Sequence, residues 1–368
     1  MNWHARFGLY IVMLSLKRRM HIPLKHIALV TMLCGCTTLA MAQRHHWPKW
    51  ALTKNDTSYV EDHSREFTFR LYESRKYGAF AVHERGGNQK FRYFSNTPFN
   101  IGVGANYRTF ALNLGFNFPF INNGLKEKYG KPKYLDLQTH VYLRRWIADI
   151  YLQYYKSYYL VNPEGTIKDY VEDGQHARRP DIQSIAAGGT ITYIDNDEKF
   201  SYRANSIQVD WQKKSAGSWI AAVSTMFVNV HGDSSLVPAN MKDEGYLSTR
   251  PYDRTGHWQI TAGGGYGYTF VYRQHFFATL VAQVGVGINT GATQFSDGVR
   301  ERGAGFGWNT NLRAAIGYNS ARYFAGIHWE NFGLHNSVAA ANAYETYGTG
   351  NLRVSIAKRF FVKRHRKG

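Results

Sequence analysis

The stretch Gln274–Thr290 has apolar side chains at alternate positions over nearly its whole length. Every even-numbered residue from Phe276 to Ile288 is apolar, whereas the odd-numbered ones are mostly Thr, Gln, Gly or Asn. A period of two indicates a β-strand with one apolar face. Strands of ordinary sheets are usually about five or six residues long, whereas a tilted membrane-spanning strand needs about 9–11. We therefore predict an all-β fold, a single antiparallel transmembrane β-barrel.

The same alternation recurs in other segments and brings the predicted total to about 12 strands, an even number as single-chain barrels require. Short turns are expected at 106–109, 144–149, 271–274 and 319–322, and long loops at 81–97, 121–133, 162–181, 231–255, 291–306 and 334–349. Short periplasmic turns and long outer loops are typical of such barrels. Short turns and long loops alternate along the chain only if 199–217 is not a strand of the barrel wall. We therefore predict a periplasmic excursion at 199–217 that could include a short helix. The other eleven segments begin near Phe67, Phe99, Phe110, Leu135, Ala148, Ile182, Trp219, Trp258, Trp308, Tyr323 and Leu352.

Composition agrees with a barrel. No run of 18 apolar residues follows position 42, which argues against a helical membrane protein, and the 26 Tyr and 35 Gly suit membrane interfaces and tight turns. The formal charge is +19, of which residues 1–42 contribute five basic and no acidic residues. The remaining basic residues are scattered singly. We therefore expect anionic outer-membrane lipid as a partner, or an anion-favouring lumen, rather than nucleic acid.

Residues 20–42 have the features of a signal peptide, so 1–42 would be removed and Met20 would be the true start. Lys25 is the basic residue, an apolar run follows, and Ala40-Met41-Ala42 gives the cleavage site. An alternative is a lipobox at Leu33–Cys36, which would place a lipid on Cys36. Both cysteines lie in this segment, so cleavage after Ala42 would leave no thiol for a disulfide, a nucleophile or a metal site.

Three motifs resemble a known family. They are RLYESRKY at 70–77, KFSYRA at 199–204 and QKKSAGS at 212–218. They are similar to a family of Bacteroidota outer-membrane proteins that is catalogued only as domain of unknown function 4421. The resemblance covers roughly residues 55–362 and implies a barrel in the Gram-negative outer membrane, but it implies no activity. We divide the chain into a periplasmic lead-in at 43–65, the barrel at 66–362 and a basic tail at 363–368.

With the apolar faces toward lipid, a group of charged side chains falls inside the barrel. Arginines with one Glu and one His could form an anion-binding ladder, because Arg presents a fixed fork to carboxylate or phosphate. The favoured alternative is a structural ion-pair ladder. If the lumen is open, rings of Arg would make it anion-selective. The candidates are Arg70, Asp136, His140, Arg313, His328, Glu330, Arg353 and Arg359.

A catalytic or metal-binding role has weaker support. Asp136, His140 and Tyr142 lie near Asp149 and Tyr151, and Asp with His could serve as a base and its orienter. No Ser stands at a recognisable spacing, so lumen filling is the favoured interpretation. The four histidines of the lead-in and first loop share no metal-ligand spacing, and we expect them to be solvated; they are His45, His46, His63 and His83. No cofactor is predicted.

Two classes of function remain. The favoured one is a non-enzymatic outer-membrane barrel: a narrow pore, a structural component or an assembly component. The other is an enzyme that acts on lipid, lipopolysaccharide or peptide at the outer rim. Barrel-assembly machinery is an expected partner, and no cargo is indicated. Eight strands leave room only for side chains and 16–18 leave a channel, so twelve strands do not decide whether the lumen is open.

Overall fold

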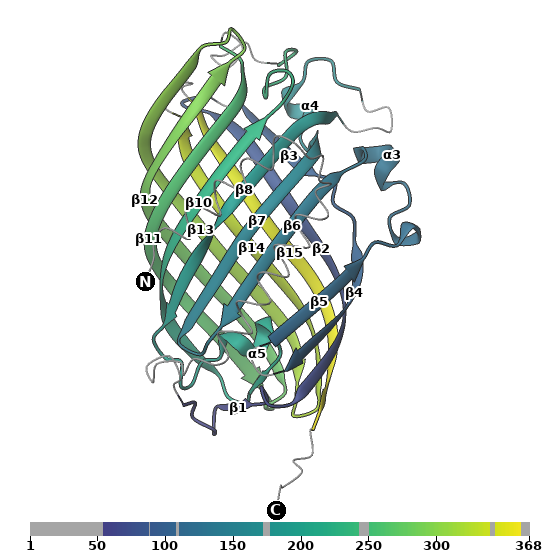
Figure 1. Ribbon diagram of the computed structural model, residues 1–368, viewed down its shortest axis with the longest axis vertical. Helices are drawn as coiled ribbons and strands as arrows, with labels where there is room; N and C mark the ends of the chain where they lie inside the picture. The colour runs from purple at the N-terminus through teal and green to yellow at the C-terminus, as the bar shows by residue number, and fades with distance from the viewer. Residues whose placement is uncertain are drawn as a thin grey trace, which may run out of the picture. The chain divides into compact units, whose positions relative to one another are not determined.

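A computed structural model describes residues 54–87, 89–107, 110–171, 177–242, 250–338 and 343–361. The chain divides after Trp50, and the fold described below belongs to the unit that begins at Ala51. Figure 1 shows its strands as a tilted, twisted barrel wall. The strands are β1 Val60–Asp62, β2 Phe67–Glu84, β3 Lys90–Ser95, β4 Asn100–Tyr107, β5 Phe110–Phe116, β6 Lys133–Tyr142, β7 Trp146–Leu160, β8 Arg178–Ile194, β9 Asp210–Gln212, β10 Ala216–His231, β11 Tyr252–Tyr272, β12 Phe276–Phe295, β13 Arg300–Asn319, β14 Tyr323–Val338 and β15 Ala343–Phe360.

The barrel closes because its last strand pairs with its first long one. From β7 to β15 the strands β7, β8, β10 and β11 to β15 pair in order, each antiparallel to the next. β15 then pairs with β2 along the whole length of β15, and short β3 joins β2 to β7. These ten strands form a closed ring. β4 and β5 extend from the lower part of β2, while β6 lies beside β7 (Figure 1).

Burial along the strands is the reverse of that in a soluble protein. In β12, Leu280 is 59% exposed and Ile288 68% exposed, whereas Gln283 is 4% and Asn289 2% exposed. Apolar side chains therefore face outward and polar ones face the lumen, as in a barrel surrounded by lipid. The predicted all-β barrel fold is confirmed. No helix in the described parts of the chain is long and apolar enough to cross a membrane.

All twelve predicted segments lie largely in strands, but three of the predicted loops are wrong, and the closed ring has ten strands rather than about 12. Most of 81–97 belongs to β2 and β3. The stretch 291–306 is mostly strand, because β12 continues to Phe295 and β13 begins at Arg300. Most of 334–349 also belongs to β14 and β15. Apolar alternation stops where the outer face leaves the lipid, but backbone pairing continues beyond that level. We call this end of the barrel the loop end. The opposite one is the turn end, where Arg273 and Gln274 both have positive φ, as in a type I′ hairpin.

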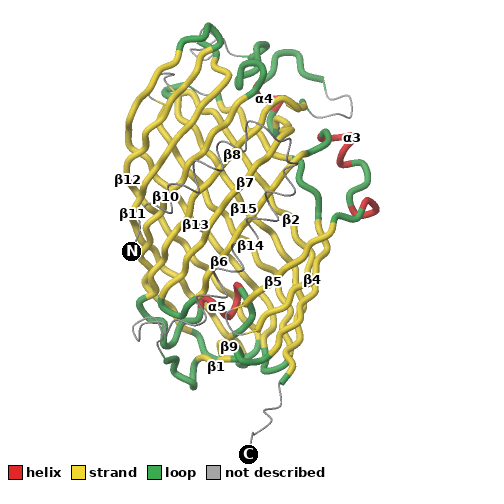
Figure 2. Tube along the Cα trace, viewed as in Figure 1, coloured by secondary structure: helices red, strands yellow, loops and turns green. Residues whose placement is uncertain are grey.

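The predicted excursion at 199–217 does contain a short helix, but it folds into the barrel mouth. It holds the helix α5, Tyr202–Ser206, and then β9, which pairs with β1 from the lead-in. The lead-in is therefore partly a strand. The Ser201 side chain caps α5 by accepting a hydrogen bond from the Ala204 N–H at 3.1 Å. We call residues 200–212 the plug, since Phe200, Ala204 and Gln208 are each 1% exposed. Figure 2 shows α5 and β9 near the turn end.

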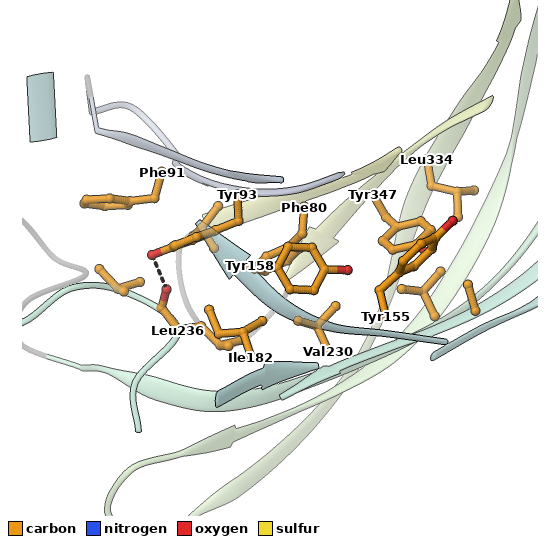
Figure 3. Packing of buried hydrophobic residues seen from close by; sticks show 14 of the residues in the cluster. Phe80, Phe91, Tyr93, Tyr155, Tyr158, Ile182, Val230, Leu236, Leu334 and Tyr347 are labelled. Carbon is orange, nitrogen blue, oxygen red and sulfur yellow. Dashed lines mark hydrogen bonds between the residues drawn. The ribbon is translucent and has the colours of Figure 1, made fainter. Parts of the chain in front are cut away.

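The lumen near the loop end is filled by a cluster of buried aromatic and aliphatic side chains (Figure 3). Wall strands supply most of them, including Phe80, Tyr155 and Tyr347, while Leu236 enters from the loop between β10 and β11. The Tyr93 hydroxyl donates a hydrogen bond to the Leu236 carbonyl at 2.8 Å, which holds this loop in the lumen. The remaining helical turns, η2 Pro119–Ile121, α3 Leu125–Tyr129 and α4 Pro163–Thr166, lie in loops.

Candidate functional site: a charged layer and an unpaired seam

A layer of charged side chains is centred on Arg313 of β13. Its Nη2 lies 2.5 Å from Asp149 Oδ2, and its Nη1 lies 3.7 Å from Glu330 Oε2. The His140 Nδ1 is 2.6 Å from the other oxygen of Asp149. Strand register places these residues together, because Arg313 is opposite Glu330 and His140 is opposite Asp149. The sequence pattern predicted only Glu330 as a counter-ion for the arginines, but Asp149 is the nearer partner of Arg313.

The layer fits a structural ion-pair network better than a catalytic centre. Arg313 is 3% exposed and Asp149 1% exposed, and buried charges persist when they are paired with each other. Arg313 also donates to the Tyr142 hydroxyl at 3.2 Å and lies over the ring of Tyr202 in the plug. A His–Asp pair needs a nucleophile or substrate on the other ring nitrogen. Within the described residues, no hydroxyl side chain hydrogen-bonds to His140.

Asp136 belongs to a separate group. It lies 3.3 Å from the Lys76 ammonium and accepts a hydrogen bond from Gln153 Nε2 at 3.1 Å. The Tyr155 hydroxyl donates to the same carboxylate, and Gln153 Nε2 also donates a hydrogen bond to Thr349 Oγ1 at 2.7 Å. The sequence suggested that Asp136 and His140 belong to one polar group, but the structure places them in two networks. His140 lies with Asp149 in the charged layer, and Asp136 lies in the other network.

The other predicted lumen arginines bind the plug. Arg353 donates to the Ser206 carbonyl at 2.9 Å, and Arg359 donates to the Gln208 carbonyl at 2.8 Å. Arg70 donates to the Gln208 side chain and also to Asn113 of β5. These guanidinium groups therefore do not form a free wall that an anion would meet.

His328 faces the lumen between these groups. It is opposite Arg353 in the register of β14 and β15, and it is 7% exposed. Its Nδ1 has no hydrogen-bond partner within the described parts of the chain. Strand register thus brings His328 beside Arg353, one of the predicted arginines.

One wall of the barrel contains a seam, which we define as the facing edges of β5 and β6. Within the described residues, β5 pairs only with β4 and β6 only with β7. The sequence predicted both strands, but strand periodicity does not reveal a missing pairing between neighbours. Side chains beside the seam remain accessible: Asn113 is exposed although it faces the lumen, and the His140 side chain is 22% exposed.

A second buried pair, His257 with Glu345, was not predicted from the sequence. The two side chains approach to 2.9 Å, and the Tyr252 hydroxyl donates to the other Glu345 oxygen at 2.7 Å. Glu345 was missed because it lay in a predicted loop. Its place between apolar Ala343 and Tyr347 on β15 was an available signal. The Thr255 hydroxyl contacts the same ring nitrogen, Nε2, as Glu345 does, so these residues do not form a relay through the two ring nitrogens.

Two histidines expected to be solvated are buried. His63 is 3% exposed and lies 2.9 Å from Glu66, and His83 is 7% exposed and stacks on Tyr344. Both lie where local strands pack, since the lead-in forms β1 and β2 extends to Glu84. His45 and His46 lie outside the described residues. Where the structure is described, no cluster of His, Cys, Asp or Glu could hold a metal ion.

Comparisons with known proteins identify a family but no role. A family model described as "Domain of unknown function (DUF4421)" matches residues 54–360. No curated protein matches the chain. The similar solved structures include the outer-membrane protease OmpT of Escherichia coli, with a TM-score of 0.38 and 10% identity over 83% of this chain and 100% of that one. An outer-membrane channel from Pseudomonas putida F1 has a TM-score of 0.27 and 10% identity over 84% and 100%. The toluene transporter TodX of Pseudomonas putida has a TM-score of 0.20 and 9% identity over 81% and 91%. These scores are too low to transfer a function.

Proposed function

Because the chain belongs to this family, whose description gives no role, we propose a function from the barrel itself. In this proposal the protein is a non-enzymatic outer-membrane barrel without a through-pore. Amphiphilic molecules of the membrane exchange with its lumen through the seam. The observation that carries the proposal is the unpaired edges of β5 and β6 within the apolar belt.

The outer surface supports a location in a membrane. On both sides of the seam the outward side chains are apolar and exposed, including Leu114 and Phe116 of β5 and Ile150 and Leu152 of β7. A closed antiparallel barrel with longer loops at one end is the architecture of outer-membrane proteins. Delivery after signal-peptide cleavage, insertion by barrel-assembly machinery and contact with outer-membrane lipid are parts of the same proposal.

A through-pore is disfavoured because three successive layers occupy the lumen. The plug lies at the turn end, the charged layer around Arg313 lies above it, and the aromatic cluster lies toward the loop end. Each layer contacts several wall strands. We therefore expect no steady ion conductance from the native protein.

The seam is the place where lipid and lumen can meet. Unpaired backbone N–H and C=O groups cost several kcal/mol each in hydrocarbon, so such an edge must face water, a polar ligand or another strand. The lumen-facing residues of both edges are polar or small, among them Asn113, Gly115, Gln138 and His140. A polar headgroup can follow this lining while its apolar chain stays beside Leu114.

An enzyme is the second candidate, and the observation in its favour is the close contact between His140 and Asp149 beside the seam. Among the described residues no nucleophile contacts this pair, and Asp149 is already neutralised by Arg313. We therefore favour exchange without chemistry.

The test uses single cysteines and a phospholipid that carries a maleimide on its headgroup. Cys34 and Cys36 are first replaced by Ser, which removes both native thiols. Asn113→Cys reports on the lumen side of the seam, Leu114→Cys is the lipid-facing positive control, and Asn311→Cys, at a site 4% exposed, is the buried negative control. We expect the lipid reagent to label Asn113→Cys and Leu114→Cys but not Asn311→Cys. Labelling of Leu114→Cys alone would show a closed seam and overturn the proposal.

A further inference from the structure

Three arginines stand together on the outer surface near the loop end, across the barrel from the seam. Arg254 lies on β11, and Arg300 and Arg302 lie on β13. Gln294 of the intervening strand β12 is opposite both Arg254 and Arg300, and Ala292 is opposite Arg302. Residues directly opposite each other in an antiparallel sheet share a face at about 4.5–5.5 Å. The three cationic side chains therefore project from one small area.

A hollow of about 530 Å³ lies among these side chains. Gly256 and Ala292, which are opposite each other, line it with little side-chain volume, and Asn229 and Gln294 contribute amides. A Cβ at position 256 would lie 2.9 Å from Asn229 Nδ2, so glycine at this position leaves room for the Asn229 amide at the hollow. Phe227 and Trp258 line its side toward the middle of the barrel.

Within the described parts of the chain, the three arginines meet no protein anion. Among the residues that the structure describes, none of them forms an ion pair or a hydrogen bond from its side chain. Neighbouring Arg250 differs, since it pairs with Glu301. Three unneutralised guanidinium groups around a hollow are suited to bind an anion with several oxygens.

The level of the hollow along the barrel axis indicates which class of anion it binds. Just below it on the same outward face, Trp258 is 51% exposed, Ile288 68% and Phe306 63%. The arginines therefore lie at the upper edge of the apolar belt, at the level where lipid headgroups meet water. An aromatic residue at this boundary can cover the first part of an acyl chain.

We propose that this hollow binds the phosphorylated headgroup of a lipid in the outer leaflet. The arginines hold the phosphate, the Asn229 and Gln294 amides donate to neighbouring headgroup oxygens, and the acyl chains lie along Trp258 and Ile288. The site is remote from the seam, so it does not rest on the proposed exchange function.

The test compares two glycolipids of the outer leaflet that differ only in phosphorylation. The full chain in nanodiscs is assayed for retained lipid by native mass spectrometry and for Tm. The variant carries Arg254→Gln, Arg300→Gln and Arg302→Gln together, and the matched control is Arg322→Gln, an exposed arginine at the turn end. An attraction near a membrane surface is worth about a five-fold change in affinity per arginine, so the triple variant should bind roughly 100-fold more weakly. Arg322→Gln should bind like the native chain.

Several results would overturn the proposal. Equal retention of the phosphorylated lipid by the native chain and the triple variant would show that the arginines do not bind the lipid. Equal binding of the two lipids would show that the phosphate is not recognised. Displacement of the lipid by an equimolar amount of inorganic phosphate would identify a site for a free anion instead. Heat-modifiable migration on gels verifies that every variant is folded before binding is compared, and a second triple variant with Lys at the three positions, which keeps the charge, should retain most of the binding.

Discussion

Replacing Arg359 by Met should loosen the plug. Arg359 is 2% exposed, and its guanidinium group donates to the Gln208 carbonyl through Nη2 at 2.8 Å and through Nε at 3.1 Å. It also donates to Asn319 Oδ1 at 3.0 Å and to the Ser320 carbonyl. Met fills much of the same volume without a donor. The substitution therefore separates hydrogen bonding from packing.

The loss can be estimated from the acceptors left behind. Each buried acceptor without a partner costs about 1–3 kcal/mol. Of the four acceptors, the Asp210 carbonyl keeps the Asn319 amide as a donor, whereas those at Gln208 and Asn319 lie deep enough to be denied water. Gln208 also has a positive φ of 58°, a conformation that costs about 1–3 kcal/mol in a residue other than glycine. We expect plug docking to weaken by about 3 kcal/mol, which raises the undocked population roughly 150-fold.

Urea unfolding in lipid vesicles measures this change and should show a lower midpoint for Arg359→Met. Planar bilayers should stay silent, because the charged layer and the aromatic cluster still fill the lumen. Arg359→Lys keeps the charge but has a single donor nitrogen, so its midpoint should lie between those of the native chain and Arg359→Met. An unchanged unfolding midpoint for Arg359→Met would refute the conclusion that this arginine holds the plug.

Three further results are expected. Leu280→Arg should reduce folding into vesicles strongly, because a charge at the lipid face near mid-strand costs about 2–4 kcal/mol, whereas Gln283→Arg faces the lumen and should not meet this lipid cost; equal yields would contradict the assigned faces. Arg313→Met should destabilise the barrel by about 3–5 kcal/mol in urea, because Asp149 is left buried without its cation, and adding Asp149→Leu should recover part of that loss. Outside the wall strands, burial disfavours the ionised carboxylate of Asp62, but Arg203 and a turn hydrogen bond outweigh it and lower its pKa. Its stabilising contribution should therefore be complete above about pH 4 and disappear as the pH falls further, so the difference in urea midpoint between the native chain and Asp62→Asn should shrink at low pH.

The sequence predicted the wall well because lipid imposes a regular pattern on it. The alternation from Phe276 to Ile288 determines the strand, its faces and its lipid contact without any knowledge of its neighbours. The loop-end halves of β13 and β15 were missed because lipid no longer requires apolar residues there. Arg300 and Glu345 are polar, yet both lie in paired strands.

The interior was less predictable because it depends on contacts between distant segments. Local patterns placed Arg353 and Arg359 in the lumen, but nothing near them indicates that the partners are backbone carbonyls of Ser206 and Gln208. Likewise, the seam is the absence of a pairing. The edge of β6 has the same alternation as a paired strand, and periodicity reports the two faces of a strand rather than its neighbours.

The plug also has a consequence for the order of folding. Gln208 contacts Arg70 of β2 and Arg359 of β15, and β2 and β15 are the two strands whose pairing closes the ring. They are distant in the chain, whereas the plug is tethered midway between them. A segment that binds both ends can act as a template that reduces the entropic cost of their meeting. We therefore expect the plug to dock before the ring closes, so that the last strand pairing forms around a plug that is already in place.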